Sequence, residues 1–286
     1  MPEGDTIFRA ARTLNRALAG EPIIRFESVF ATLTRVDEDR GIVGRTVEKV
    51  EARGKWILMY FSGGLVLLTH MLMRGSWHIY RPGERWRLPH SRMRIMLGTE
   101  PLVAVAFNLQ IAEFHTEDSL RRRRGFSALG PSLLTSDFDE EEGARRMLAF
   151  GSQEVGEVLL KQSVVAGIGN VFKSEVCFTC RVHPFRKVSS LSQHEARTLM
   201  KVARAYLQAN VTDTSWNRIV TYSGMRRTTS RSNPEERLWV YKRNGEPCRR
   251  CGALIRCAKQ GPDARVTFWC PDCQTLEPEL EQRNAG

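Results

Sequence analysis

Residues 248–252 read Cys-Arg-Arg-Cys-Gly, and residues 270–274 read Cys-Pro-Asp-Cys-Gln. Each Cys-x-x-Cys pair, Cys248 with Cys251 and Cys270 with Cys273, can supply two thiolates from a tight turn. The interval between the pairs fits a zinc ribbon in which one tetrahedral ion holds all four sulfurs. The sequence therefore predicts one structural Zn²⁺, because four protein ligands leave no position open for a substrate or for water.

The composition indicates a globular protein of 286 residues, long enough for two domains, with a hydrophobic fraction of 42%. The chain shows no apolar run of membrane-spanning length and no secretory segment at its start. We therefore expect a cytoplasmic protein without membrane contact. Seven cysteines, an odd number, are expected to be ligands or buried small residues in such a compartment rather than disulfides.

The chain is strongly basic, with a formal net charge of +11 from 43 Lys and Arg against 32 Asp and Glu. Local clusters occur at Arg121–Arg124, Arg226–Arg227 and Arg249–Arg250. Any one cluster could be a solvated face. Several together favour a polyanionic partner, of which nucleic acid is the commonest.

Apolar residues at helical spacing predict a helix over residues 7–18, ended by Gly20. From Ile23 to Phe114 the pattern changes to short β-rich runs, which predict an antiparallel sandwich or barrel. The clearest runs are residues 56–61, 65–69, 93–97 and 102–107, with a hairpin turn at residues 62–64.

Helical character begins after Leu129-Gly130-Pro131, and Ser192 with Glu195 forms a capping box ahead of an apolar stripe. The predicted fold class is α+β: an N-terminal helix with an antiparallel β-sandwich, then a helical domain and the ribbon. The expected boundaries are 1–132 for the β-sandwich domain, 133–243 for the helical domain, 244–276 for the ribbon and 277–286 for a tail.

The chain starts Met1-Pro2-Glu3-Gly4, and a small second residue permits removal of the initiator methionine. Pro2 would then present a secondary amine, which attacks an aldehydic carbon to give an iminium that is cationic without further protonation. An α-amino group has an ordinary pKa of about 8, so part of it is unprotonated at neutral pH. Glu3 beside it is a candidate general acid/base.

Motifs along nearly the whole chain, from Pro2 to Gln274, together resemble the formamidopyrimidine-DNA glycosylase/endonuclease VIII family of base-excision repair enzymes. These motifs are Pro2-Glu3-Gly4, Arg53-Gly54-Lys55, Thr69-His70 followed by Met73 and Gly75, Gly167-Ile168-Gly169-Asn170, Gly245-Glu246-Pro247-Cys248, and the ribbon with Arg265 and Thr267. The resemblance implies a helix–two-turn–helix in the helical domain and double-stranded DNA with a damaged base or abasic site as the partner.

The resemblance also implies residue roles. Pro2 is similar to the nucleophile that attacks C1′, Glu3 to the acid/base, and Lys55 to a β-hairpin lysine that contacts phosphate and assists catalysis. His70, Asn170 and Arg265 resemble the phosphate ligands of the family. Independently, the glycines before Asn170 allow backbone N–H groups at a helix start to approach a phosphate. Arg265 lies between the zinc knuckles, where a rigid hairpin can present a guanidinium.

Met73 resembles a residue that fills the gap left by a flipped base, and an unbranched thioether suits an irregular void. A buried core methionine is the alternative. In the endonuclease VIII branch the void-filling residues are consecutive, which gives Leu72, Met73 and Arg74. In the formamidopyrimidine branch an Arg and a Phe come from a later loop, where this chain has Arg121–Arg124 and Phe126 in a short segment.

Three further cysteines are expected to lie outside any metal site. Cys177 and Cys180 form a third Cys-x-x-Cys pair with His183 nearby, but further ligands are not evident, so we interpret both as helix-packing residues. Cys257 lies inside the ribbon loop, where the four better-spaced cysteines already complete the tetrahedron.

The sequence therefore predicts a monomeric, nucleoid-associated bifunctional DNA glycosylase/AP lyase. The resemblance implies excision of oxidised bases, with pyrimidines favoured by Gly4 and the short wedge segment, through a Pro2 Schiff base and β,δ-elimination. Alternatives are a catalytically silent protein that binds damaged DNA, an 8-oxoguanine/formamidopyrimidine-type glycosylase, and a hydrolytic zinc enzyme.

Overall fold

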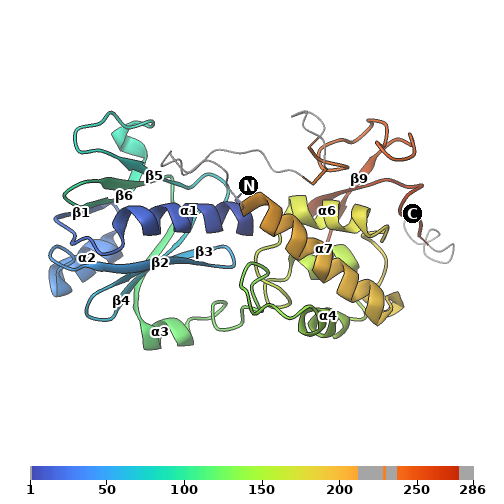
Figure 1. The fold of residues 1–286 in the computed structure, drawn as a ribbon, viewed down its shortest axis with the longest axis horizontal. Helices are drawn as coiled ribbons and strands as arrows, with labels where there is room; N and C mark the ends of the chain where they lie inside the picture. The colour runs from blue at the N-terminus through green and yellow to red at the C-terminus, as the bar shows by residue number, and fades with distance from the viewer. Residues whose placement is uncertain (1, 212–227, 230–236, 277–286) are drawn as a thin grey trace. The chain divides into compact units, whose positions relative to one another are not determined.

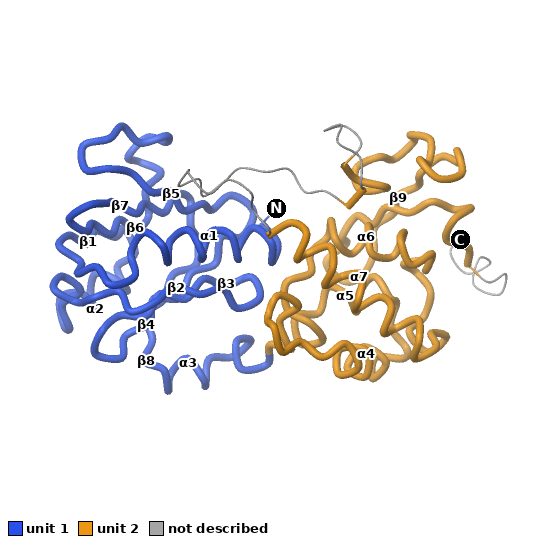
Figure 2. The backbone as a smooth tube through the Cα atoms, in the orientation of Figure 1, with its two compact units in different colours: residues 1–128, 213–224 blue, residues 129–212, 225–286 orange. Residues whose placement is uncertain are grey.

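The computed structural model describes residues 2–211, 228–229 and 237–276 (Figure 1). The chain divides into two compact units (Figure 2). The described residues of the first unit lie within 2–128, and those of the second lie within 129–276.

The first unit contains helices and two four-stranded antiparallel sheets, whose strand orders are β2-β3-β4-β8 and β1-β6-β7-β5. This arrangement confirms the predicted α+β class. The elements are α1 (Gly4–Leu18), β1 (Arg25–Ser28), α2 (Ala31–Arg40), β2 (Val47–Arg53), β3 (Trp56–Phe61), β4 (Leu65–His70), β5 (Ser76–Tyr80), the 3₁₀ helix His90–Arg92, β6 (Met93–Gly98), β7 (Val103–Phe107), β8 (Ile111–Thr116) and α3 (Glu117–Arg122).

The predicted strands and their hairpin are present. β3 and β4 pair from Trp56↔His70 to Phe61↔Leu65, and the turn between them uses Gly63 and Gly64 at φ of 79° and 71°. Glycine adopts a positive φ at little cost, which allows this tight turn to form. The apolar face of α1 packs into the same core as the strands, as the helical periodicity of residues 7–18 indicates.

Helix α2 interrupts the region that the sequence pattern assigns to strands. Its sequence, Ala-Thr-Leu-Thr-Arg-Val-Asp-Glu-Asp-Arg, buries only Leu33. A helix with one buried side chain shows almost no apolar periodicity, so its formation depends on packing of that residue into the core rather than on a local pattern.

The second unit contains helices and a two-stranded ribbon, β10-β9, within one compact body. The capping box is confirmed, since Glu195 N–H donates to Ser192 Oγ at 3.2 Å and Ser192 N–H donates to Glu195 Oε2 at 2.8 Å. Its elements are α4 (Glu140–Leu148), α5 (Val155–Leu160), α6 (Asn170–Thr179), the 3₁₀ helix Val188–Ser190, α7 (Gln193–Val211), β9 (Arg256–Gln260) and β10 (Arg265–Trp269).

Helix α6 is the element that joins the helices to the ribbon. It packs on α7 and on α5, and it also packs against β10. A small apolar cluster that includes Phe178, Ile255 and Phe268 fills this junction. Within the described residues, no helix is both long and apolar enough to cross a membrane.

Candidate functional site

Pro2 and Glu3 are buried at the start of α1. Glu3 is the N-cap residue, its side chain has 0% exposure, and its carbonyl accepts a 3.0 Å hydrogen bond from Ile7 N–H. A carboxylate at a helix N-terminus is stabilised by the positive end of the helix dipole. The helix thus holds an acid/base group at a fixed point directly beside residue 2.

Lys55 and His70 lie at one end of the β2–β3–β4 sheet. Lys55 follows Gly54, whose φ of 60° forms the β2–β3 turn, and His70 is the last residue of β4, paired with Trp56. Burial, together with the nearby charges of Lys55 and Arg123, lowers the pKa of His70 to about 4. His70 is therefore a neutral imidazole at physiological pH.

The hydrogen bonds of His70 define which ring nitrogen can donate. Leu72 N–H donates to Nδ1 at 3.0 Å, so Nδ1 is the acceptor and the proton is assigned to Nε2. The Trp56 ring meets the imidazole edge-on at 4.7 Å, and the Arg123 guanidinium lies 4.4 Å from the Trp56 ring centre. The packed ring thus retains one N–H donor, which suits a phosphate oxygen.

The turn after His70 presents the three consecutive candidate void-filling residues. Met73 is 63% exposed, which is incompatible with the core alternative, and Arg74 is exposed beside it. Leu72 is half-buried at a φ of 46°, a conformation that costs a non-glycine residue energy. Gly75 closes the turn, since a Cβ there would meet the Met71 carbonyl oxygen at 2.5 Å.

The later segment that could have supplied wedge residues is occupied by contacts within the protein. Phe126 is 2% exposed and packs beneath the Arg53 guanidinium, 4.7 Å from the ring centre. Arg123 forms an ion pair with Glu113 at 2.6 Å in addition to its contact with Trp56. Part of this arginine cluster is therefore structural.

In the second unit, Asn170 and the strand that starts at Arg265 come together. Asn170 is the first residue of α6, after Gly167 at a φ of 114°. Its Nδ2 donates to the Val266 carbonyl oxygen at 2.7 Å, and Arg265 itself is exposed. An exposed guanidinium thus adjoins a helix N-terminus, where backbone N–H groups favour anions.

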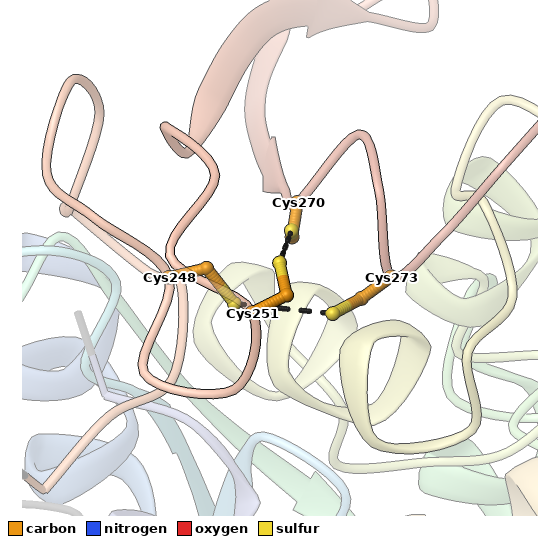
Figure 3. Close-up of side chains that lie close together, drawn as sticks. All are labelled: Cys248, Cys251, Cys270 and Cys273. Carbon is orange, nitrogen blue, oxygen red and sulfur yellow. Dashed lines mark hydrogen bonds between the residues drawn. The ribbon is translucent and has the colours of Figure 1, made fainter.

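The four predicted zinc ligands meet at one point (Figure 3). Their sulfur atoms all lie within 4.8 Å of one another, with 3.9 Å from Cys248 to Cys273 and 3.4 Å from Cys251 to Cys270. Tetrahedral zinc with Zn–S bonds of about 2.3 Å requires sulfur separations of about 3.8 Å. The residues therefore fit one structural Zn²⁺.

The other cysteines lie outside this cluster. Within the residues that the structure describes, the four ribbon cysteines are the sole group of three or more His, Cys, Asp or Glu residues placed to share an ion. Cys177 is buried in the helical core, Cys180 packs beside it, and Cys257 is exposed on β9. Burial raises the pKa of Cys180 to about 12, which keeps it a thiol.

Several charged residues have structural roles that local sequence does not reveal. Glu175 is fully buried in α6, where its carboxylate accepts hydrogen bonds from the Trp239, Val240 and Tyr241 N–H groups at 2.8–2.9 Å. The Arg250 guanidinium lies 4.5 Å from the Phe178 ring centre. Neither residue carries a local sequence pattern that distinguishes it from a solvated charge. Arg226 and Arg227 lie outside the described residues.

Comparison with known proteins assigns the whole chain to one family. Residues 1–108 match the formamidopyrimidine-DNA glycosylase N-terminal domain, residues 129–219 match the formamidopyrimidine-DNA glycosylase H2TH domain, and residues 245–276 match the zinc finger found in FPG and IleRS. The third match agrees with the cysteine geometry, so the zinc-ribbon prediction is confirmed.

The relatives agree with these domain matches. A protein of Streptomyces coelicolor named probable endonuclease 8 2 is 38% identical over 96% of this chain and 94% of its own length. The DNA-(apurinic or apyrimidinic site) lyase Nei2 of Mycolicibacterium smegmatis is 35% identical over 96% of this chain and 99% of its own length.

The fold agrees as well. The Lactococcus lactis Fpg structure, solved with DNA that contains N7-benzyl-Fapy-dG, superimposes with a TM-score of 0.80 at 22% identity, covering 96% of this chain and all of that one. The fold and the zinc ribbon are thus those of the DNA glycosylases with a helix–two-turn–helix. The chain belongs to the formamidopyrimidine-DNA glycosylase/endonuclease VIII family of DNA-repair enzymes.

Proposed function

We propose that this protein is a bifunctional DNA glycosylase/AP lyase that excises oxidised pyrimidines through a Schiff base on Pro2. The observation that carries the proposal is the fully buried Glu3 carboxylate, held at the N-terminus of α1 next to Pro2. An acid/base group fixed beside a secondary amine is the arrangement that amine catalysis needs. The amine becomes available when the initiator methionine is removed.

In the proposed reaction the Pro2 nitrogen attacks C1′ of the damaged nucleotide, and the bond from C1′ to the base breaks with its electron pair on the departing base, which takes a proton from water. The Glu3 carboxylate accepts the Pro2 N–H proton. Glu3 then returns this proton to O4′ as the C1′–O4′ bond opens, which leaves a cationic iminium. Loss of a C2′ proton then expels the 3′ phosphate by β-elimination. A second elimination expels the 5′ phosphate, and water hydrolyses the imine to release Pro2.

Four side chains contact the DNA backbone in this proposal. Lys55 and Arg265 supply cations, while His70 supplies a neutral N–H donor and Asn170 supplies its amide beside a helix N-terminus. Cations that neutralise phosphates release counterions, so log K should fall linearly with log[salt], by about 0.9 per phosphate neutralised on duplex DNA. The protein would act as a monomer on duplex DNA.

The preference for oxidised pyrimidines rests on the wedge. The turn Leu72-Met73-Arg74, in which Met73 and Arg74 are exposed and Leu72 is half-buried, would supply three consecutive void-filling residues, while Phe126 is buried and therefore not free to intercalate. Excision should be measured on matched duplexes with thymine glycol, 5-hydroxycytosine, dihydrouracil or 8-oxoguanine. Dominant activity on 8-oxoguanine opposite cytosine would reverse the assignment to the pyrimidine branch.

Borohydride trapping tests the Pro2 chemistry, because borohydride reduces the iminium to a stable amine that links protein to DNA. We expect a covalent complex with abasic-site DNA from the native chain. The complex should disappear in a chain with a permanent N-terminal extension, since the extension converts the amine into an amide. The same extension placed at the C-terminus is the matched control. A native chain that binds abasic DNA without trapping would instead be a silent damage-binding protein.

A further inference from the structure

Lys173 is a lysine with 0% exposure on α6, and nothing in the proposed chemistry uses it. A buried ammonium is costly unless hydrogen bonds satisfy it. Its Nζ donates to Thr267 Oγ1 at 2.6 Å, and Thr267 belongs to β10, the strand that begins with Arg265. The charge therefore points into the joint between α6 and the ribbon rather than toward solvent.

From Thr267 a chain of hydrogen bonds continues across the ribbon. Thr267 Oγ1 donates to Gln260 Oε1 at 2.8 Å, and Gln260 belongs to β9. Gln260 Nε2 donates to Glu154 Oε2 at 2.9 Å and to the Pro184 carbonyl oxygen at 2.8 Å. Every donor points the same way, from the Lys173 cation to the Glu154 anion, so each bond polarises the next.

Helix α5 leaves space for the Gln260 side chain of this hydrogen-bond network. A Cβ on Gly156 would lie 2.3 Å from Gln260 Oε1. Because Thr267 and Glu154 already hold the Gln260 amide, it cannot move aside without breaking one of these bonds. Glycine at position 156 is thus explained by the close approach of Gln260.

We propose that Lys173 is a positioning residue for Arg265, which it holds in place through Thr267 and Gln260 without touching DNA. Arg265 and Lys173 line the same cavity of about 190 Å³. This series of hydrogen bonds links both strands of the ribbon to α6 and to the start of α5. The hairpin that presents Arg265 is therefore held from two sides. This inference rests on the proposed role of Arg265 as a phosphate ligand.

The test is the salt dependence of binding to a duplex with a tetrahydrofuran abasic analogue. Arg265→Ala should reduce the slope of log K against log[salt] by about 1. Lys173→Met should weaken binding by about tenfold and lower the slope by no more than Arg265→Ala does, because a displaced guanidinium neutralises its phosphate less completely. Lys201→Met, which removes an exposed charge on α7, is the control for charge loss.

A double-mutant cycle then separates positioning from direct contact. If Lys173 acts through Arg265, Lys173→Met should cost little in the Arg265→Ala background, whereas independent contacts would add. Additive losses would overturn the inference.

Gly156→Ala keeps the test valid if Lys173→Met does not fold. Alanine favours a helix more than glycine does, so any loss of binding in Gly156→Ala must come from displacement of Gln260. It should weaken binding about tenfold with a slope no lower than that of Arg265→Ala, and wild-type affinity would contradict the inference.

The failure of the proposed function can be recognised separately. If Arg265→Ala alters neither affinity nor slope, Arg265 is not a phosphate ligand. Hydrogen exchange would then report on the network itself, and Lys173→Met should lose amide protection in β9 and β10. If the amides of β9 and β10 remain protected in that variant, the hydrogen-bond network does not hold the hairpin in place, whether or not Arg265 binds phosphate.

Discussion

The side-chain amide of Asn170 donates a 2.7 Å hydrogen bond to the carbonyl oxygen of Val266, the residue directly after Arg265. One bond thus joins the first residue of α6 to the ribbon strand. Two candidate phosphate ligands that are far apart in the sequence therefore have a fixed relation within the second unit. A change at Asn170 should affect both the anion site and the strand beside it.

Asn170→Asp tests this relation. The carboxylate cannot donate to Val266, and its charge opposes a phosphate at the helix start. We expect binding to abasic-analogue duplex to weaken by about 2 kcal/mol, roughly thirtyfold in Kd. Fluorescence anisotropy measures the loss. Asn210→Asp on α7 makes the same charge change as a control, and equal losses in both variants would mean that charge alone is responsible.

Met73→Ala and Phe126→Ala should have different effects, because Met73 is proposed to fill the void in the DNA and Phe126 packs in the protein core. Met73 is 63% exposed, so its truncation should leave thermal stability unchanged, whereas it should slow base excision by about tenfold because the flipped-out state loses its filler. Phe126 is 2% exposed, so its truncation should cost about 3–5 kcal/mol of unfolding free energy. Single-turnover excision and denaturant unfolding provide the two readouts. A stability loss in Met73→Ala would contradict the wedge assignment.

Cys270→Ser should release the zinc ion, whereas Cys257→Ser should retain it. Cys270 is one of the four clustered thiols, and Cys257 is exposed on β9 outside the cluster. Metal content per chain is the direct measurement. Loss of the ion should weaken DNA binding, because the hairpin that carries Arg265 loses its support.

The same variant tests the role of the metal in the reaction. Trapping by Pro2 should persist in Cys270→Ser at high protein concentration, because four protein ligands leave the ion no open position for chemistry. Complete loss of trapping in folded, DNA-saturated Cys270→Ser would contradict this prediction, because the Pro2 chemistry would then depend on the ion.

Local signals explain why much of the fold could be predicted. The knuckle turns, the Ser192–Glu195 box and the Gly63-Gly64 hairpin each depend on residues within a few positions of one another. Helix α2 could not be predicted because Leu33 is its one fully buried side chain, with Val36 packed partly buried against the same core. Its helical state depends on tertiary packing that no short window of sequence contains.

In the candidate site, too, some features follow from local sequence and others depend on tertiary contacts. Met73 could be proposed from sequence, but its exposure, which removes the core alternative, is a property of the folded turn. Lys173 was missed because a lysine within α6 has the same local pattern whether it faces water or Thr267. The partner lies on another element, and the burial of polar side chains depends on such distant partners.

His183 should make stability fall as the pH is lowered from about 6.5 to 4. Its ring is 5% exposed, accepts a 3.3 Å hydrogen bond from Phe185 N–H and packs against Trp269 at 5.4 Å. Burial lowers the pKa of His183 from 6.5 to about 4. Between these values the unfolded chain binds the proton and the folded chain does not, so acid favours unfolding.

The contribution of this one group is at most about 3 kcal/mol between pH 7 and pH 4. Asn offers an acceptor oxygen near the position of Nδ1 but does not titrate. His183→Asn should therefore be less stable at pH 7, with a shallower decline of unfolding free energy toward pH 4. Urea unfolding at a series of pH values gives both curves, and their difference removes the carboxylates and His70, which are common to both proteins. Parallel curves would show that His183 is not held neutral in the folded state.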